Sequence, residues 1–463
     1  MPKKSAQKIH NKSDDPALEN HLDDILKLLY SFYDQEIDMS LGRVTRFLAQ
    51  LGNPHLNLPR VIHVAGTNGK GSTIAILRSL LEASGKSVHV MTSPHLVHPT
   101  ERIRLAGELI STQGLIDVLE ECLAVNRNEP ITFFEMFTAA SFLAMARTPA
   151  DYVLLETGMG GRLDATNVVP NPICTIITTI SKDHEVFLGS TLGQIASEKA
   201  GIMKAGVPCI IGYQTDAAHE ANIIKVFQEK STTLSPVSKL YRYGADWDIA
   251  PSMHETSDRL IFSWLEESIG VSRPNLLGTH QIYNAGAALA AYHVIMEKDE
   301  TNKFNTSILS PENENNPLLT IHWPGRLQRL ENEPITKLVQ AGQEIWVDGG
   351  HNDSAGKFLA QQAQKWKGED GKPLHLIIAM VERKNPKDFL TPLIPYTNSL
   401  TCTKIKDEPN SYTAQKLYDL CKPLDFKEIY ISENVEEAVK NITDPNARIL
   451  ITGSLFFLGT ILT

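Results

Sequence analysis

A glycine-rich segment with one lysine and two hydroxyls carries the clearest chemistry in this sequence. Residues 66–73 read Gly-Thr-Asn-Gly-Lys-Gly-Ser-Thr and follow an apolar, mostly β-branched run at residues 61–65. Such a run is typical of a buried strand, and glycines let the chain after it turn sharply and approach a ligand. A helix opening at Ser72 would direct N–H groups and a positive dipole end at a phosphate. Lys70 would add charge for the outer phosphates, and Ser72 or Thr73 a hydroxyl for Mg²⁺.

This segment departs from the strict phosphate-loop pattern G-x-x-x-x-G-K-[ST]. Val64 stands where the first glycine should be, and Gly71 separates Lys70 from the hydroxyls. A glycine-rich turn without a ligand is the alternative, but the order of strand, glycines, lysine and hydroxyls favours a phosphate loop. The predicted phosphate-binding residues are Gly66, Thr67, Asn68, Gly69, Lys70, Gly71, Ser72 and Thr73.

Polar side chains also follow three further predicted strands, where open α/β sheets bind ligands. They are Ser93 and His95 after residues 88–91, Glu156 after 152–155, and Asp183 with His184 after 174–179. A carboxylate beside a phosphate loop supplies an oxygen that Mg²⁺ prefers, which makes Glu156 a candidate ligand. Asp183 and His184 could bind a second divalent ion. Read alone, a turn at Ser93 and a solvated Asp183–His184 pair explain these residues equally well.

Three further candidates lie in the last third of the chain. Arg326 is a planar cation suited to a polyphosphate, and Asp348 and His351 follow a predicted strand at residues 344–347. If two domains face each other, these groups would close over the nucleotide and exclude water. Lys199, by contrast, reads by itself as an ordinary surface lysine.

These side chains require a scaffold of alternating strands and helices, which predicts parallel sheets with helices on both faces. Besides the strands above, helices are expected at 22–30, 41–51, 115–125, 133–146, 192–202 and 279–296. A second alternation has strands at 344–347, 374–380, 428–431 and 448–452, and helices at 354–365, 413–421 and 434–442. The fold class is therefore α/β: an N-terminal domain like the P-loop NTPases, with a mostly parallel sheet, and a smaller Rossmann-like C-terminal domain.

The chain of 463 residues is long enough for two domains. Composition divides it into a flexible tail at 1–20, a nucleotide-binding domain at 21–300 with an antiparallel appendage near 240–275, a linker at 301–318 and a C-terminal α/β domain at 319–463.

Composition also excludes several classes of protein. A net charge of −10 and a pI near 5.9 argue against nucleic-acid or membrane-surface binding. Five scattered cysteines without a C-x-x-C pair indicate neither a disulfide framework nor a zinc site, which favours the cytoplasm. The polar N-terminus does not read as a signal peptide, and the apolar end at residues 449–463 is too short to span a membrane.

Nine motifs occur in the order seen in one family of enzymes. They are Gly66–Ser72, Ser93–Val97 with Thr100–Arg102, Thr132–Glu135, Glu156–Asn167, Asp183–His184, Glu198–Gly201, Asn284–Ala285, Pro324–Arg326 and Asp348–Asn352. Over roughly residues 20–460 the sequence thus resembles the folylpolyglutamate synthase/dihydrofolate synthase family of the Mur ligase superfamily.

The resemblance implies an ATP-dependent amide ligase of folate biosynthesis. ATP would phosphorylate a carboxylate of dihydropteroate, of a (tetrahydro)folyl-glutamate or of both, and the amine of L-glutamate would displace phosphate from the acyl phosphate. It also implies ATP and two Mg²⁺ ions as cofactors, a monovalent cation as a further candidate, small-molecule substrates as the partners, and a monomer.

The resemblance assigns roles residue by residue. Lys70 resembles the lysine that holds the outer phosphates, while Asn284, Arg326, Asp348 and His351 resemble residues at the nucleotide. Ser93 and Glu156 would hold one Mg²⁺ and His184 the second. Lys199 looks like the lysine that becomes carbamylated, which converts a cation into an anionic metal ligand. The implied catalytic residues are Lys70, Lys199, His184 and Glu156, and the implied folate contacts are Phe134, Thr132, Glu135, Arg162 and Asp164, with Phe134 stacking on the pterin ring.

Two C-terminal motifs depart from the family. Its usual Asp-Gly-Ala-His-Asn-Pro has Gly350 in place of alanine and Asp353 in place of proline. Of its usual Gly-Met-x-x-Asp-Lys-Asp only Met380 and Lys384 remain, which leaves open how the second domain grips glutamate or the nucleotide.

Two alternatives remain at this point. One is a ligase of the same superfamily for another carboxylate, such as a cell-wall precursor or another polyglutamate acceptor; the short segment of about 60 residues before the loop argues against a cell-wall ligase. The other is a P-loop kinase or nucleotide-driven switch, in which Arg326, Asp348 and His351 would have no purpose.

Overall fold

The computed structural model describes residues 11–32, 39–214, 217–252, 259–298, 304–310 and 312–462. They form two compact units. The first unit takes the described parts of Met1–Ile180, Leu188–Asn275 and Ile282–His322, and the second those of Ser181–Phe187, Leu276–Gln281 and Trp323–Thr463. Among the described residues, no helix has both the length and the apolarity that crossing a membrane requires.

The first unit is built on a sheet with strand order β4-β3-β2-β5-β1-β6-β7-β8. Its strands are β1 (Arg60–Ala65), β2 (Val88–Met91), β3 (Ile103–Leu105), β4 (Glu108–Leu109), β5 (Tyr152–Glu156), β6 (Cys174–Ile177), β7 (Cys209–Ile211) and β8 (Leu240–Arg242). All pairs from β2 to β8 are parallel, whereas β3 and β4 join as antiparallel edge strands. The central strand β1 is buried from Val61 onward because helices cover both faces.

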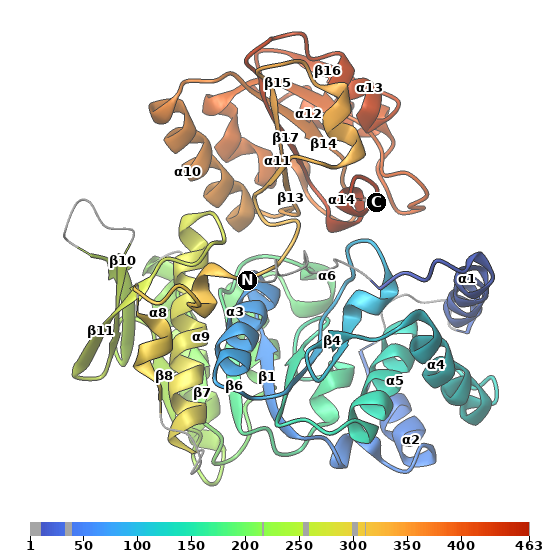
Figure 1. Cartoon of the computed structure of the whole chain (residues 1–463), viewed down its shortest axis with the longest axis vertical. Helices are drawn as coiled ribbons and strands as arrows, with labels where there is room; N and C mark the ends of the chain where they lie inside the picture. The colour runs from blue at the N-terminus through green and yellow to red at the C-terminus, as the bar shows by residue number, and fades with distance from the viewer. Residues whose placement is uncertain are drawn as a thin grey trace. The chain divides into compact units, whose positions relative to one another are not determined.

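Helices of the first unit form two layers (Figure 1). They are α1 (Pro16–Ser31), α2 (Gly42–Gln50), α3 (Lys70–Ala83), α4 (Thr112–Asn126), α5 (Phe133–Arg147), α7 (Leu192–Ala200), α8 (Ala217–Thr233) and α9 (Thr279–Glu297, of which the first three residues belong to the second unit); the short α6 (Glu185–Leu188) starts in the second unit. One core cluster joins α1, α2, α4 and α5 to β1 and β5, and another joins α7 and α8 to β6 and β7.

A small antiparallel sheet follows β8 and comprises β9 (Trp247–Pro251), β10 (Arg259–Trp264) and β11 (Glu267–Ser272). It lies against α9, where a Cβ on Gly286 would come within 2.6 Å of Trp247 and Ile249. The absence of a side chain at Gly286 therefore lets the small sheet pack directly on the helix.

The second unit has strand order β12-β13-β17-β14-β15-β16, parallel except for β12. Its strands are β12 (Gln328–Leu330), β13 (Glu344–Asp348), β14 (Leu374–Ile378), β15 (Thr397–Cys402), β16 (Ile429–Ile431) and β17 (Arg448–Thr452). Its helices are α10 (Asp353–Glu369), α11 (Pro386–Leu390), α12 (Ala414–Cys421), α13 (Val435–Lys440) and α14 (Leu455–Gly459). In Figure 1, α10 and α14 lie on opposite sides of this sheet. The predicted α/β fold class is confirmed.

Two expectations about the connecting segments are wrong where the structure describes them. The predicted tail at 1–20 is too long, because α1 begins at Pro16 and the Asp15 side chain caps it by accepting from the Ala17 N–H. The predicted linker at 301–318 packs into the first unit: Leu309 and Leu318 are fully buried, and the Asn316 amide donates to Ser272 and to two backbone carbonyls. Residues 1–10, 301–303 and 311 lie outside the described residues.

Candidate functional site

Two glycines shape the loop between β1 and α3. Gly66 and Gly69 have φ angles of +153° and +88°, which side-chain-bearing residues rarely adopt. A Cβ on Gly66 would lie 1.8 Å from the Thr178 hydroxyl, and one on Gly69 would lie 2.3 Å from Asn284 Oδ1. The loop therefore requires glycine at both positions, and it places the predicted nucleotide residue Asn284 directly beside Gly69.

The two residues that follow β6 anchor the same loop. The Thr67 N–H donates to the Thr179 carbonyl (2.9 Å), and the Thr178 hydroxyl donates to the Asn68 carbonyl (2.7 Å). Helix α3 starts at Lys70, so its first-turn N–H groups have no intrahelical acceptors. Among the described residues the buried hydroxyl of Thr73 has no hydrogen-bond partner, and an oxygen-rich ligand at the helix start would satisfy it.

Lys70, Glu156 and Ser93 meet at the carboxyl ends of three neighbouring strands. Because β5 pairs with β1 and places Glu156 opposite Val64, the Glu156 carboxylate reaches the loop. Its Oε1 lies 3.9 Å from Lys70 Nζ, and its Oε2 accepts the Ser93 N–H at 3.1 Å. Sequence reasoning predicted these residues separately, and the fold brings them together.

Lys199 approaches the same loop from α7. It is only 4% exposed, and its Nζ donates to the Gly66 carbonyl at 2.9 Å; Lys70 Nζ donates to that carbonyl at 3.1 Å. Two ammonium groups on one carbonyl oxygen form a concentrated positive site, which suits a polyphosphate. Carbamylation of Lys199 would remove one of the two charges and supply an oxygen ligand instead.

Close packing of α7 on the glycine loop at 158–161 positions Lys199. A Cβ on Gly161 would lie 2.9 Å from the carbonyls of Glu198 and Lys199. A Cβ on Gly201, just after α7, would lie 2.3–2.6 Å from the N, Cα and Cβ atoms of Arg162. Glycine is therefore required where the helix and the loop cross, which explains the motif that ends at Gly201.

Gly201→Ala is expected to lower the free energy of unfolding by about 1–3 kcal/mol, because the new methyl group overlaps backbone atoms that cannot move independently. Gly193, in the first turn of α7, serves as the control, because a Cβ added there would meet no heavy atom within 4 Å. Gly193→Ala should be neutral or stabilising by up to about 1 kcal/mol. Urea denaturation of both variants measures the difference, and equal stabilities would contradict this packing.

Residues predicted to contact folate divide into two groups. Phe134 lies in the first turn of α5, where its ring sits 2.5–2.9 Å from the position of a Cβ on Gly158; this is consistent with an aromatic face beside the glycine loop. The half-exposed Arg162 pairs with Glu198 at 2.8 Å. Thr132, Glu135 and Asp164 instead hold the backbone that carries these two residues.

The backbone role of Thr132, Glu135 and Asp164 is visible in their partners. Thr132 and Glu135 form a capping box at α5, and Glu135 also accepts from Arg43 Nε at 3.1 Å. Asp164 is buried and accepts from the Met159 and Thr166 N–H groups and from the Thr166 hydroxyl. Burial raises the pKa of Asp164, and these hydrogen bonds oppose the rise.

In the second unit, Asp348 ends β13 and holds the loop that carries Arg326. Its carboxylate accepts the N–H groups of Leu327 (2.9 Å) and Gly350 (2.7 Å). Burial raises the pKa of Asp348, and the nearby Arg326 charge opposes this. A Cβ on Gly349 would lie 2.8 Å from Arg326 Nη1, so glycine makes room for the guanidinium.

Asp183 and His184 belong to the second unit as well. The Asp183 carboxylate accepts the backbone N–H of His184 at 2.8 Å, pairs with the Lys384 ammonium, and lies 3.5 Å from His351 Nε2 and 3.4 Å from Asn352 Nδ2. Burial raises the pKa of Asp183, but the hydrogen bond from His351 and the charges of His351, Lys384 and His184 outweigh it and hold that pKa far below its usual range.

Sequence reasoning noted Lys384 only as a residue of an altered motif and did not single out Thr178 and Thr179. For Lys384 the signal was present, since it persists in a motif where three other residues (Ala379, Arg383 and Asn385) differ from the family pattern. For the two threonines, their position immediately after β6 was the available signal.

The donor set around Glu156 fits a divalent ion that binds together with a nucleotide. Among the described residues, no group of three or more His, Cys, Asp or Glu side chains could hold a metal by itself. Glu156 and Ser93 offer oxygen donors beside the helix start, and Mg²⁺ commonly binds through one or two carboxylates plus substrate phosphates.

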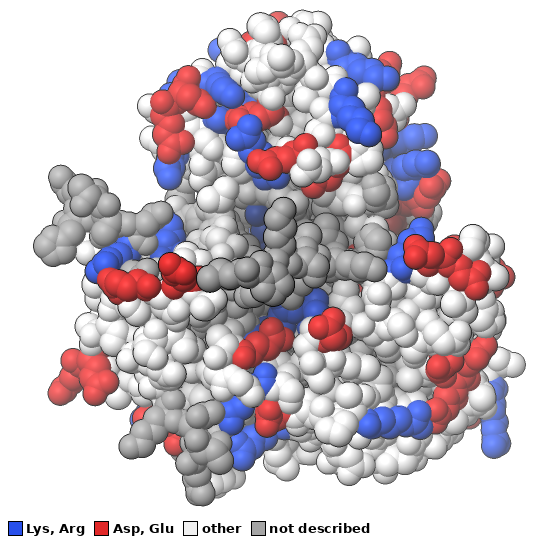
Figure 2. Space-filling model, in the orientation of Figure 1, with Lys and Arg blue, Asp and Glu red and all other residues white. Residues whose placement is uncertain are grey.

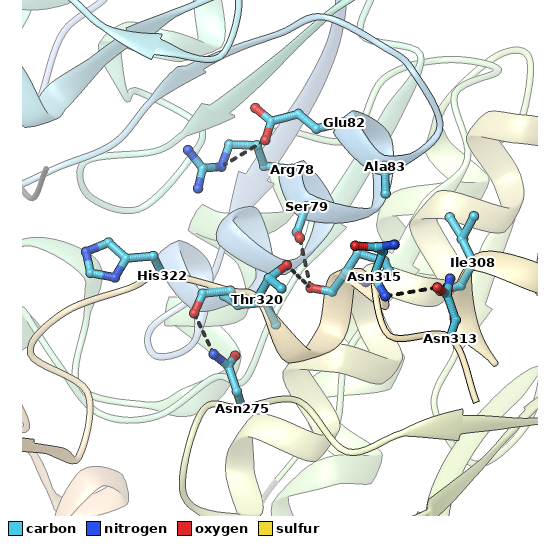
Figure 3. Close-up of a pocket in the computed structure, with 12 residues that line it drawn as sticks. Arg78, Ser79, Glu82, Ala83, Asn275, Ile308, Asn313, Asn315, Thr320 and His322 are labelled. Carbon is cyan, nitrogen blue, oxygen red and sulfur yellow. Dashed lines mark hydrogen bonds and ion pairs between the residues drawn. The ribbon is translucent and has the colours of Figure 1, made fainter. Parts of the chain in front are cut away.

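A separate pocket of about 800 Å³ lies on the first unit beside the last turns of α3 (Figure 3). Arg78, Glu82 and His322 line it. Burial lowers the pKa of His322, and the charges of Arg78 and Arg104 lower it further. Burial lowers the pKa of Arg104, and the charges of Glu82 and Glu108 oppose this change. Charged groups of both signs therefore lie in and beside this pocket. Charges of both signs are likewise interspersed on the face of each unit seen in Figure 2.

Two models of protein domains match this chain. The model of the Mur ligase middle domain matches residues 64–292, and that of the dihydrofolate synthetase C-terminal domain matches residues 331–463. Dihydrofolate synthetase of Saccharomyces cerevisiae is 31% identical over 92% of this chain and 97% of its own length.

Solved structures extend the similarity to the whole fold. Escherichia coli FolC in complex with DHPP and ADP is 27% identical, with a TM-score of 0.78 over 95% of this chain and 96% of that one. A bifunctional folylpolyglutamate synthase/dihydrofolate synthase with Mn, AMPPNP and L-glutamate bound is 25% identical, with a TM-score of 0.78 over 95% and 97%.

Proposed function

This chain belongs to the dihydrofolate synthase/folylpolyglutamate synthase family, and from that premise we propose that it joins L-glutamate to dihydropteroate, to folyl-glutamates or to both at the expense of ATP. The observation that carries the proposal is the convergence of Lys70, Lys199 and Glu156 at the loop that follows β1. Such a site suits the transfer of a phosphoryl group to a carboxylate.

The reaction needs little covalent chemistry from the protein. A carboxylate oxygen of the folate-side substrate takes the γ-phosphoryl group of ATP, ADP leaves, the amine of glutamate attacks the acyl carbon, and phosphate departs. Lys70 and the first-turn N–H groups of α3 stabilise charge on the phosphoryl oxygens. When bound, divalent ions neutralise the crowded oxygens.

The proposed roles are those that the family resemblance implies. Ser93 and Glu156 hold one Mg²⁺ and His184 the second, and Lys199 becomes a metal ligand when it is carbamylated; a monovalent cation is a further candidate. Asn284 and the loop bind the nucleotide, with Arg326, Asp348 and His351 as its contacts from the second unit. Phe134 stacks on the pterin, and Arg162 meets the pteroate side. Thr132, Glu135 and Asp164 act through the backbone that they cap.

We further propose that the protein is a monomer of the cytoplasm that takes only small molecules as substrates. The five cysteines are all buried and free, which supports a reducing compartment.

Phe134→Ala is expected to raise the KM for the folate substrate about 10-fold, because the stacking face is lost, while the KM for ATP stays near that of the wild type. Phe134→Tyr keeps the face and serves as the control. Steady-state kinetics with each substrate varied in turn decides the matter; equal effects on both KM values would reject the stacking role.

Product analysis tests the proposed function. Incubation with ATP, L-glutamate and either dihydropteroate or tetrahydrofolate should give ADP, phosphate and a product one glutamate heavier, detected by mass spectrometry. ADP release that needs an acid but no glutamate would indicate a kinase. Glutamylation of some other carboxylate only would indicate a ligase of different specificity.

A further inference from the structure

The Asp183 carboxylate is a junction of three segments of the second unit. Its donors come from its own segment (the His184 N–H), from the loop between β13 and α10 (His351 and Asn352), and from the loop after β14 (Lys384). Its side chain is 10% exposed, as is that of Lys384. A buried ion pair with several hydrogen bonds fixes the orientation of what is attached to it.

The backbone of Lys384 is itself firmly held. The Tyr412 hydroxyl donates to the carbonyls of Glu382 (2.8 Å) and Lys384 (3.2 Å), and the Lys384 N–H donates to the Val381 carbonyl (3.0 Å). The ammonium group therefore projects toward Asp183 from a rigid base, which a merely solvated lysine would not have.

His184 depends on that junction for its conformation. Its φ angle is +51°, a left-handed value that is unfavourable for residues other than glycine. The bond from its N–H to Asp183 Oδ1 stabilises this conformation, and Lys384 and Asn352 hold the carboxylate in place. His351 is fixed on both sides, by the Gly349 carbonyl at Nδ1 (3.0 Å) and by Asp183 at Nε2.

We propose that Lys384 is a positioning residue that, through Asp183, orients the imidazoles of His184 and His351 for divalent-ion and nucleotide binding. The proposal rests on the proposed function, in which His184 is a metal ligand and His351 a nucleotide contact. It gives Lys384 a role in a motif whose other retained residue, Met380, is simply buried in the core.

The test compares Lys384→Met with Lys416→Met. Lys416 also pairs with a carboxylate of the second unit, Glu382 at 2.8 Å, but its side chain is 55% exposed, against 10% for Lys384. Mn²⁺ affinity is measured by electron paramagnetic resonance with the full-length protein and a non-hydrolysable ATP analogue, so that no turnover is involved.

Lys384→Met should weaken Mn²⁺ binding about 10-fold, in the range seen when a partner of a metal ligand is removed. Lys416→Met should bind Mn²⁺ like the wild type, and Lys384→Arg, which keeps the charge, should restore most of the affinity. Wild-type affinity in a folded Lys384→Met protein, or an equal loss in Lys416→Met, would overturn the proposal.

The proposed function and the positioning role of Lys384 can be tested separately. If the wild type releases no glutamylated product in the assay above, the ligase assignment is at fault. If the wild type does release the glutamylated product and Lys384→Met leaves Mn²⁺ binding unchanged, only the positioning role is wrong. Should Lys384→Met not fold, as judged by circular dichroism, Lys384→Gln is measured against the same limits.

Discussion

Lys70→Ala is expected to lower kcat for ATP-dependent ligation by about 10²–10³-fold, the usual effect of removing one preorganised donor to a developing charge. The Lys70 ammonium is the cation that the loop itself supplies, and its bonds to the Gly66 and Thr67 carbonyls hold it beside Glu156. Because these bonds are local to the loop, the variant should fold normally. ADP release coupled to a spectrophotometric assay measures the loss.

The matched control for Lys70 is Lys225→Ala. The Lys225 side chain is 72% exposed on α8 and makes only a loose pair with Glu229 at 3.8 Å. It should keep wild-type turnover. Undiminished turnover in a folded Lys70→Ala protein would remove the phosphate role from this loop.

Lys199→Ala should cost a similar or larger part of the activity, and added bicarbonate should not restore it. The alanine variant has no amine to carbamylate, so it loses both the buried nitrogen at the Gly66 carbonyl and the proposed anionic ligand. Lys199→Met keeps most of the side-chain volume and should be equally inactive, which separates chemistry from a packing defect.

Lys204→Ala is the control for that loss, because Lys204 also donates to a backbone carbonyl, that of Asn167 at 3.3 Å, and lies outside the predicted site. Its turnover should stay near the wild type. Carbamylation itself is checked in a high-resolution electron-density map; an unmodified Lys199 far from any metal would contradict it, as would full activity in Lys199→Met.

The glycine loop between β1 and α3 was predictable because its signals are local. The strand, the glycines and the lysine follow each other within residues 61–73. The glycines indicated a sharp turn of the chain, and Gly66 and Gly69 have the positive φ angles of such a turn. The strand-end carboxylate Glu156 was also predictable, since parallel strands bring their carboxyl ends to one edge of a sheet.

The pairing of Asp183 with Lys384 was not predictable, because the two residues are 201 positions apart and nothing local indicates the contact. By contrast, the capping role of Thr132 and Glu135 could have been found: Thr-x-x-Glu before an apolar run is a helix-start signature. Family resemblance had suggested a substrate contact there, and the local physics of the helix end explains both residues better.

Several elements were missed for reasons of length and composition. β3, β4, β7 and β8 have at most three residues each, too few to show a period. β15, at Thr397–Cys402, is rich in polar residues that are nevertheless buried, so its sequence resembles a loop. The Asn- and Pro-rich segment at 301–318 resembled a linker for the same reason.

The most direct measurement of the central claim is a crystal structure with a non-hydrolysable ATP analogue and Mg²⁺. The triphosphate should lie against the backbone N–H groups at the start of α3, with the Lys70 ammonium at its outer phosphates and Mg²⁺ at Glu156. A triphosphate bound anywhere other than the loop of residues 66–73 would contradict the account.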